Sequence, residues 1–174
     1  ESWDMTFTSH QNGKTGHADQ LNFRKKFEST SVISNVFKGN LDTNKSDNDN
    51  VFGINLSVSS KLGNSWDMEL EGKYSDQDTF MRRYGFDSDS KYKSFISLEK
   101  KNQNAISNIE IYNIENLDEG KNSNNEPVLA PAISHHIFNS NDNYNYDIKL
   151  NAHSIYNDEY YDIKRWSGSG EIGK

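Results

Sequence analysis

Between residues 64 and 75, apolar and charged side chains alternate along the chain with a period of two. A β-strand turns successive side chains to opposite faces, whereas a helix would distribute both kinds around its axis. The segment is therefore predicted to be a strand with one apolar and one charged face. The apolar series is Trp66, Met68, Leu70 and Tyr74, with Gly72 between the last two. The charged series is Asp67, Glu69, Glu71 and Lys73.

The same alternation returns elsewhere, most clearly between residues 144 and 156, where Tyr146, Ile148 and Leu150 alternate with polar residues such as Lys149. Strands are also predicted within residues 3–8, 21–38, 52–58, 92–100, 105–116, 128–138 and 161–166. Pro131 would favour an edge, a bulge or the start of its strand. The segment between Phe52 and Tyr74 is predicted to form a hairpin. We expect an all-β, antiparallel meander of about eight strands.

A charged second face is unusual in a soluble sandwich but expected where a sheet separates lipid from a wet lumen. Several predicted strands have about the 9–11 residues that cross a tilted bilayer, and short turns alternate with long polar connections. We therefore predict part of a transmembrane outer-membrane β-barrel. Its lipid-facing residues would be Trp66, Met68, Leu70, Tyr74, Tyr146, Ile148 and Leu150. Its lumen-facing residues, which could contact a ligand, would be Asp67, Glu69, Lys73 and Lys149.

Composition excludes several other classes of protein. Only 32% of the 174 residues are hydrophobic, the mean hydropathy is −0.97, and no apolar run is long enough for a spanning helix. The formal net charge of −7 argues against nucleic acid as a partner, and the absence of cysteine excludes disulfides and thiolate chemistry. We expect the whole chain, residues 1–174, to be an internal fragment of a single barrel domain in a longer protein.

No catalytic apparatus is predicted. Same-face carboxylates such as Asp67 and Glu69 would lie about 7 Å apart on a strand, but nothing else in the sequence builds a sugar-cleaving cleft. His135 and His136 would point to opposite faces, and the acidic stretch after Ser75 lacks the order of a calcium loop. The sequence therefore predicts no enzyme, no catalytic residue, no cofactor and no metal site.

Arg82 and Arg83 are the only adjacent arginines, and they stand among aromatic residues within an acidic connection. A guanidinium group can hold a neighbouring carboxylate or an anionic ligand. The favoured interpretation is a plug in which the arginines are ion-paired with Asp76, Asp78 or Asp87. The alternative is a site for a phosphorylated glycolipid.

The run SDQDTFMRRY at residues 75–84 resembles a segment of the LPS-assembly outer-membrane protein family LptD, also called the organic solvent tolerance family, of the alphaproteobacterial type. YKSFISLE at 92–99 is similar to the family's next strand, and EPVLAPAIS at 126–134 is similar to its proline-bracketed strand. Residues 144–165 resemble the strand and arginine-bearing turn that follow. The order and approximate spacing match over residues 66–166, where the family-like segments are clearest.

The resemblance implies a Gram-negative outer-membrane barrel that translocates lipopolysaccharide and inserts it into the outer leaflet, without covalent chemistry. It implies contact with outer-membrane lipid, a small plug lipoprotein and a periplasmic transport bridge as partners. Two other interpretations stay open. One is a different outer-membrane channel such as a porin, and the other is a soluble β-sandwich module that binds carbohydrate.

Overall fold

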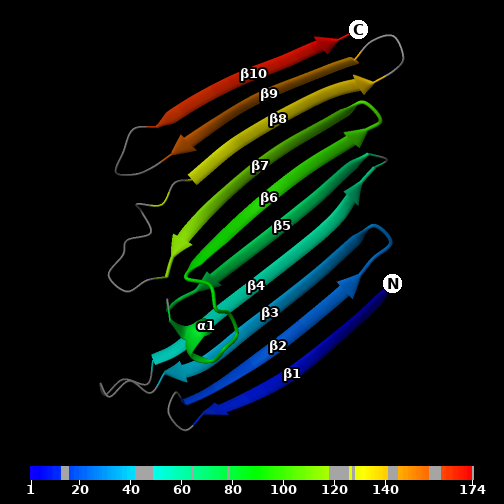
Figure 1. Cartoon of the computed structure of the whole chain (residues 1–174). Coiled ribbons are helices and arrows are strands. Elements are labelled where there is room, and N and C mark those ends of the chain that lie inside the picture. The colour runs from blue at the N-terminus through cyan, green and yellow to red at the C-terminus, as the bar shows by residue number, and fades with distance from the viewer. Residues whose placement is uncertain are drawn as a thin grey trace.

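The chain folds into one antiparallel sheet in which every strand pairs with its neighbours in sequence, in the order β1 to β10 (Figure 1). The computed structural model describes residues 1–12, 16–41, 49–63, 65–77, 79–117, 126, 128–140, 145–156 and 162–173. The strands are β1 Ser2–Asn12, β2 Gly16–Lys26, β3 Thr30–Leu41, β4 Asp49–Leu62, β5 Trp66–Ser75, β6 Lys91–Asn102, β7 Ala105–Asn116, β8 Val128–Ser140, β9 Asn145–Tyr156 and β10 Ile163–Gly173. A four-residue helix, α1 Phe80–Arg83, lies between β5 and β6.

The all-β meander is confirmed, but the sheet has ten strands where about eight were predicted. The predicted strand over residues 21–38 is divided between β2 and β3 by a tight turn, in which the Phe27 amide donates to the Thr30 carbonyl at 2.8 Å. Strand β10 continues through Gly168 and Gly170, because backbone pairing with β9 needs no apolar alternation. That glycine- and serine-rich run carried no side-chain pattern from which a strand could be predicted.

The predicted hairpin between Phe52 and Tyr74 is confirmed, with Leu62 opposite Trp66 and Val58 opposite Leu70. Gly63 in its turn has φ of +65°, which favours glycine. The predicted effect of Pro131 is also confirmed as a bulge, because the β8–β9 register shifts between Leu129 and Ala132.

The two ends of the sheet differ in the length of their connections. At one end, which we call the short-turn end, residues 27–29, 63–65, 103–104 and 141–144 join consecutive strands. At the other, the long-loop end, the intervals are residues 13–15, 42–48, 76–90, 117–127 and 157–162. Helix α1 lies at the long-loop end, in front of the sheet in the view of Figure 1. Within the described residues, no helix is long and apolar enough to cross a membrane.

Candidate functional site

The cross-strand register divides the sheet into two faces. Directly opposed residues share a face, and the face alternates along each strand. Trp66 on β5 and Leu150 on β9 lie on the same face, because a series of opposed pairs connects them. The series runs from Trp66 through Lys100, Ser107 and His135 to Leu150. All seven predicted lipid-facing residues lie on one face, the apolar face: Trp66, Met68, Leu70, Tyr74, Tyr146, Ile148 and Leu150. The predicted lumen-facing residues lie on the other, the polar face: Asp67, Glu69, Lys73 and Lys149.

The apolar face extends across all ten strands. Trp3 on β1 is 68% exposed and Trp166 on β10 is 88% exposed, so large apolar side chains face outward even at the two edges. A continuous exposed apolar surface marks contact with a membrane or another protein. Further members of this face include Met5, Phe7, Leu21, Phe23, Val32, Val36, Ile54, Leu56, Val58, Ile96, Leu98, Ile109, Ile111, Ile133, Ile137 and Ile172.

The polar face carries an inserted segment, residues 76–90, at the long-loop end of β3–β5. Gly53 is opposite Ser75, which shares its face with Lys73. The Met81 sulfur lies 2.8 Å from the point that a Cβ on Gly53 would occupy, so the segment rests on the polar face. Phe80 and Met81 of α1 are fully buried there. They belong to the sheet's buried cluster, which comprises Ala18, Phe37, Val51, Phe80, Met81, Tyr92 and Leu117.

Two glycines form the seat of the inserted segment. A Cβ on Gly39 would lie 2.9 Å from the Phe80 ring, and a Cβ on Gly53 would meet Met81. Real Cβ atoms do not approach other heavy atoms this closely, so the missing side chains let α1 approach the sheet backbone. Phe80 and Met81, which precede the two arginines in sequence, are therefore the buried anchors of the segment.

Further contacts fix the segment at its margins. The Tyr84 hydroxyl lies 2.9 Å from the carbonyl oxygen of Asn40 and 3.1 Å from that of His17, at the ends of β3 and β2. The Phe86 ring packs on Phe37 with centroids 4.5 Å apart. The segment is thus held both by burial of aromatic rings and by hydrogen bonds to strand backbone.

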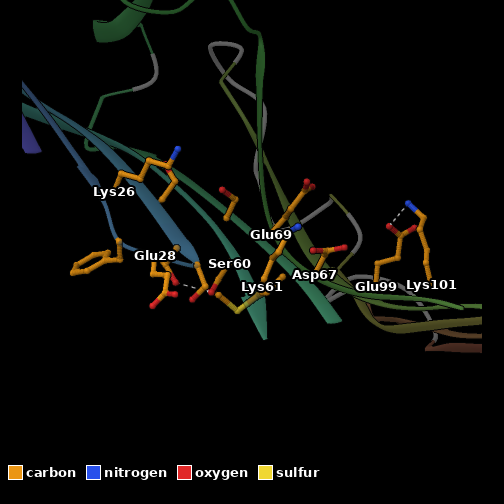
Figure 2. Close-up of a pocket in the computed structure, with 14 residues that line it drawn as sticks. Lys26, Glu28, Ser60, Lys61, Asp67, Glu69, Glu99 and Lys101 are labelled. Atoms are coloured by element: carbon orange, nitrogen blue, oxygen red, sulfur yellow. Dashed lines mark hydrogen bonds and ion pairs between the residues drawn. The ribbon is translucent and has the colours of Figure 1, made fainter. Parts of the chain in front are cut away.

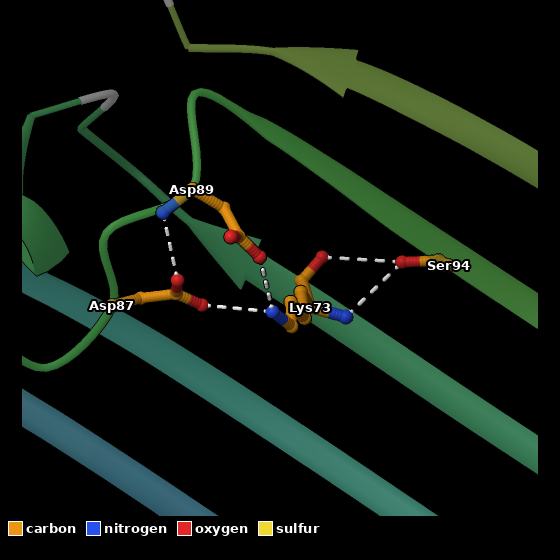
Figure 3. Close-up of polar contacts among 4 residues, drawn as sticks. All are labelled: Lys73, Asp87, Asp89 and Ser94. Atoms are coloured by element: carbon orange, nitrogen blue, oxygen red, sulfur yellow. Dashed lines mark hydrogen bonds and ion pairs between the residues drawn. The ribbon is translucent and has the colours of Figure 1, made fainter.

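Lys73 ties the end of the segment to β5 (Figure 3). Its Nζ donates to Asp87 at 2.8 Å and to Asp89 at 2.9 Å, and the Asp89 amide donates to the other Asp87 oxygen at 2.9 Å. The Asp87 side chain is only 11% exposed. Desolvation opposes its charge, but Lys73 and the amides of Ser88 and Asp89 outweigh it and hold the pKa of Asp87 below its ordinary value. Lys73, predicted as a possible ligand contact, is therefore engaged within the protein.

The two arginines do not act as a pair. Arg82 donates to the Leu117 carbonyl at 2.8 Å, whereas Arg83 is exposed and forms no ion pair within the described residues. Asp87 is paired with Lys73, and the Asp76 carboxylate accepts the Phe52 amide at 2.8 Å. Asp78 lies outside the described residues. The segment folds onto the wall as a plug-like insert, and buried rings, the Tyr84 hydroxyl and Lys73 contribute to holding it there.

A second feature is an open groove of about 660 Å³ at the short-turn end (Figure 2). Its lining mixes carboxylates and ammonium groups, and Lys101 is bound to Glu99 at 2.6 Å. Asp67 and Glu69 from β5 are part of this lining. Among the described residues, no group of three or more potential ligands could hold a metal ion. The mixed charges suit a hydrated surface.

The chain matches no protein-family model, and it matches no curated protein. The resemblance to the LptD family therefore stays a prediction that rests on the ordered segments of the sequence.

Replacing Gly53 with leucine should unseat the inserted segment, because the new side chain would occupy the position of Met81. Overpacking of this kind costs about 1–3 kcal/mol. The measurement is the rate of trypsin cleavage after Arg82 and Arg83 in the folded protein, which we expect to rise. Gly72→Leu is the matched control, since nothing lies within 4 Å of a Cβ at Gly72. Equal cleavage rates in the two variants would contradict the proposed seat.

Acid should loosen the same segment. Because the folded-state pKa of Asp87 lies below the ordinary value of 3.8, its contribution to stability is present above that value and is lost as the pH falls through the lowered pKa. Hydrogen exchange of residues 80–87, corrected for intrinsic rates, should show constant protection near neutral pH and declining protection below about pH 4. Asp87→Asn should reduce protection at neutral pH and flatten the acid dependence. A variant with wild-type behaviour would show that the Lys73–Asp87 contact does not hold the segment.

Proposed function

We propose that the chain forms part of the wall of a transmembrane β-barrel in the outer membrane of a Gram-negative bacterium. The observation that carries the proposal is the division of ten consecutive strands into one apolar and one polar face. A barrel wall needs this division, because its outer face meets hydrocarbon and its inner face meets water. The ten strands form a single sheet, without the second packed sheet of a soluble sandwich among the described residues.

The dimensions of the sheet suit a bilayer. The strands contain from 10 residues in β5 to 14 in β4, against about 9–11 needed by a tilted spanning strand. On the apolar face, Trp66 and Tyr74 lie at opposite ends of β5, about 26 Å apart along the strand. Aromatic side chains at both ends of an apolar band are typical of the two interfaces of a membrane barrel. Trp3, Trp66 and Tyr146 would occupy the interface at the short-turn end, and Phe52, Tyr74 and Tyr156 that at the long-loop end.

The two outer strands need partners in such a wall. The described sheet begins at β1 and ends at β10, and each of these strands has a free edge. Unpaired backbone groups are too costly to expose to hydrocarbon, so β1 and β10 must pair with each other or with strands outside this sheet. Either arrangement is compatible with our proposal that the chain forms part of a barrel wall.

We further propose that this barrel carries lipopolysaccharide to the outer leaflet, together with a plug lipoprotein and a periplasmic bridge. This step rests on the similarity of residues 66–166 to the LptD family. A solute channel is the second candidate function, favoured by the inserted segment, because an inward-folded segment narrows a lumen. A carbohydrate-binding sandwich is the least supported, because it requires a second sheet.

Membrane assembly tests the inside and outside assignment. Leu70→Arg would place a charge on the apolar face near the middle of β5, at a cost of about 2–4 kcal/mol in a bilayer. We expect less protein in the outer-membrane fraction and loss of the heat-modifiable folded form on gels. Glu69→Arg, on the neighbouring residue of the opposite face, should assemble normally. If both variants assembled equally well, the apolar face would not be the lipid-facing surface.

Depletion of the protein distinguishes the two candidate functions. If it carries lipopolysaccharide, newly made lipopolysaccharide should stop reaching the cell surface within a few generations, as measured by surface labelling of its sugars. If it is a solute channel, surface lipopolysaccharide should be unchanged, and the purified protein should conduct ions steadily in a planar bilayer.

A further inference from the structure

A row of apolar side chains crosses the polar face of β6–β10, where polar residues would be expected. Phe95 is opposite Tyr112, which is opposite Leu129, which is opposite Ile155, which is opposite Ile163. Phe95 is also opposite Glu71, and this fixes the row on the polar face. We call Phe95, Tyr112, Leu129, Ile155 and Ile163 the apolar row.

The apolar row is narrow and is bordered mainly by polar residues. Two residues nearer the short-turn end, the next row on the same face runs through Ser97, Glu110, Ala132, His153 and Arg165. On the long-loop side, the next pair on this face is Lys93 on β6 and Ile114 on β7. Four steps between neighbouring strands make the row about 19 Å long. It is thus a narrow strip, widened on β7 by Ile114, that lies beside hydrogen-bonding groups.

Lys93 spans the aromatic end of the row. Its Nζ lies 4.4 Å from the centre of the Tyr112 ring and 5.1 Å from that of Phe95, and it donates to Glu110 at 2.7 Å. The Lys93 side chain is 47% exposed. Because this pair is partly in water, the lysine can move aside at little cost. The two ring faces are therefore accessible to a ligand.

The inserted segment does not occupy the same strands. Its seat is formed by Gly39 and Gly53 on β3 and β4, whereas the apolar row begins on β6. Ile163 at the far end is 39% exposed, and the other four members are half-buried. The polar face of β3 and β4 is thus covered by the inserted segment, whereas the apolar row on β6–β10 stays accessible.

We propose that the apolar row is a contact site for an anionic sugar chain that moves along the polar face. A pyranose ring has apolar C–H faces and a periphery of hydroxyl groups, which matches aromatic and aliphatic side chains bordered by hydrogen-bonding groups. A lipid acyl chain fits less well, because on this narrow strip it would lie against Lys93, Glu110 and Arg165. This inference rests on the proposed function, since it requires the polar face to line a lumen.

The charges at the border favour an anionic chain over a neutral one. The Glu110 carboxylate is bound by Lys93, whereas Arg165 lies exposed on β10 opposite His153. A guanidinium group binds phosphate or carboxylate through two parallel hydrogen bonds. Phosphate groups on the sugars would therefore bind near the β10 end, while sugar rings would stack at the β6–β7 end.

Titration calorimetry on the complete protein in detergent tests the site. The probe is the phosphorylated core oligosaccharide released from lipopolysaccharide by mild acid, and the same oligosaccharide after phosphatase treatment is the phosphate-free arm. The double variant Phe95→Ser, Tyr112→Ser should bind both probes about tenfold more weakly, because two ring contacts are lost. Arg165→Ala should weaken binding of the phosphorylated probe more than binding of the phosphate-free probe.

Phe138→Ser is the matched control, because Phe138 is an aromatic residue of the polar face outside the row. It should bind both probes like the wild type, and all variants should keep the heat-modifiable folded form. Wild-type affinity in the double variant, or no binding by the wild type, would overturn the contact site. Normal lipopolysaccharide export after depletion would instead overturn the transport proposal, and the calorimetric result would stand independently.

Discussion

Strand pairing in a fixed register is the constraint on which the rest of this structure depends. Each residue of a strand faces the side opposite to its neighbours, and each pair across the ladder shares a side. A slip of one residue in any ladder would exchange the faces of every strand beyond it. The apolar face stays continuous from Trp3 on β1 to Trp166 on β10, so the register is consistent over the whole described sheet.

The polar face is where this protein departs from a plain wall. Three features lie on this face: the inserted segment packed on Gly39 and Gly53, the charged groove at the short-turn end, and the apolar row. The segment is attached by rings beneath α1 and by Lys73 at its far end, so both kinds of contact must fail before it leaves the sheet. The inserted segment thus covers the polar face of β3–β5 and leaves the polar face of β6–β10 open.

Much of the fold could be predicted, because a period of two is visible wherever one face is apolar. The β4–β5 hairpin and the strand around Leu150 followed directly from it. Strand β10 could not be predicted in full, since its pairing depends on backbone groups that leave no mark on the side chains. A plug was predicted for the inserted segment, but its attachment through Phe80 and Met81 was missed. Its signal was the pairing of Phe80 and Met81 with Gly39 and Gly53, which only the register brings together.

The glycines of β10 have a mechanical consequence. Gly168 and Gly170 lie opposite Leu150 and Ile148, and a Cβ on Gly168 would come within 3.2 Å of the Leu150 side chain. At these two positions β10 contributes no side chain to the apolar face, so the Leu150 and Ile148 side chains lie over its backbone. Register in this stretch therefore depends more on main-chain hydrogen bonds than on interlocked side chains, which lowers the resistance of the β9–β10 seam to sliding.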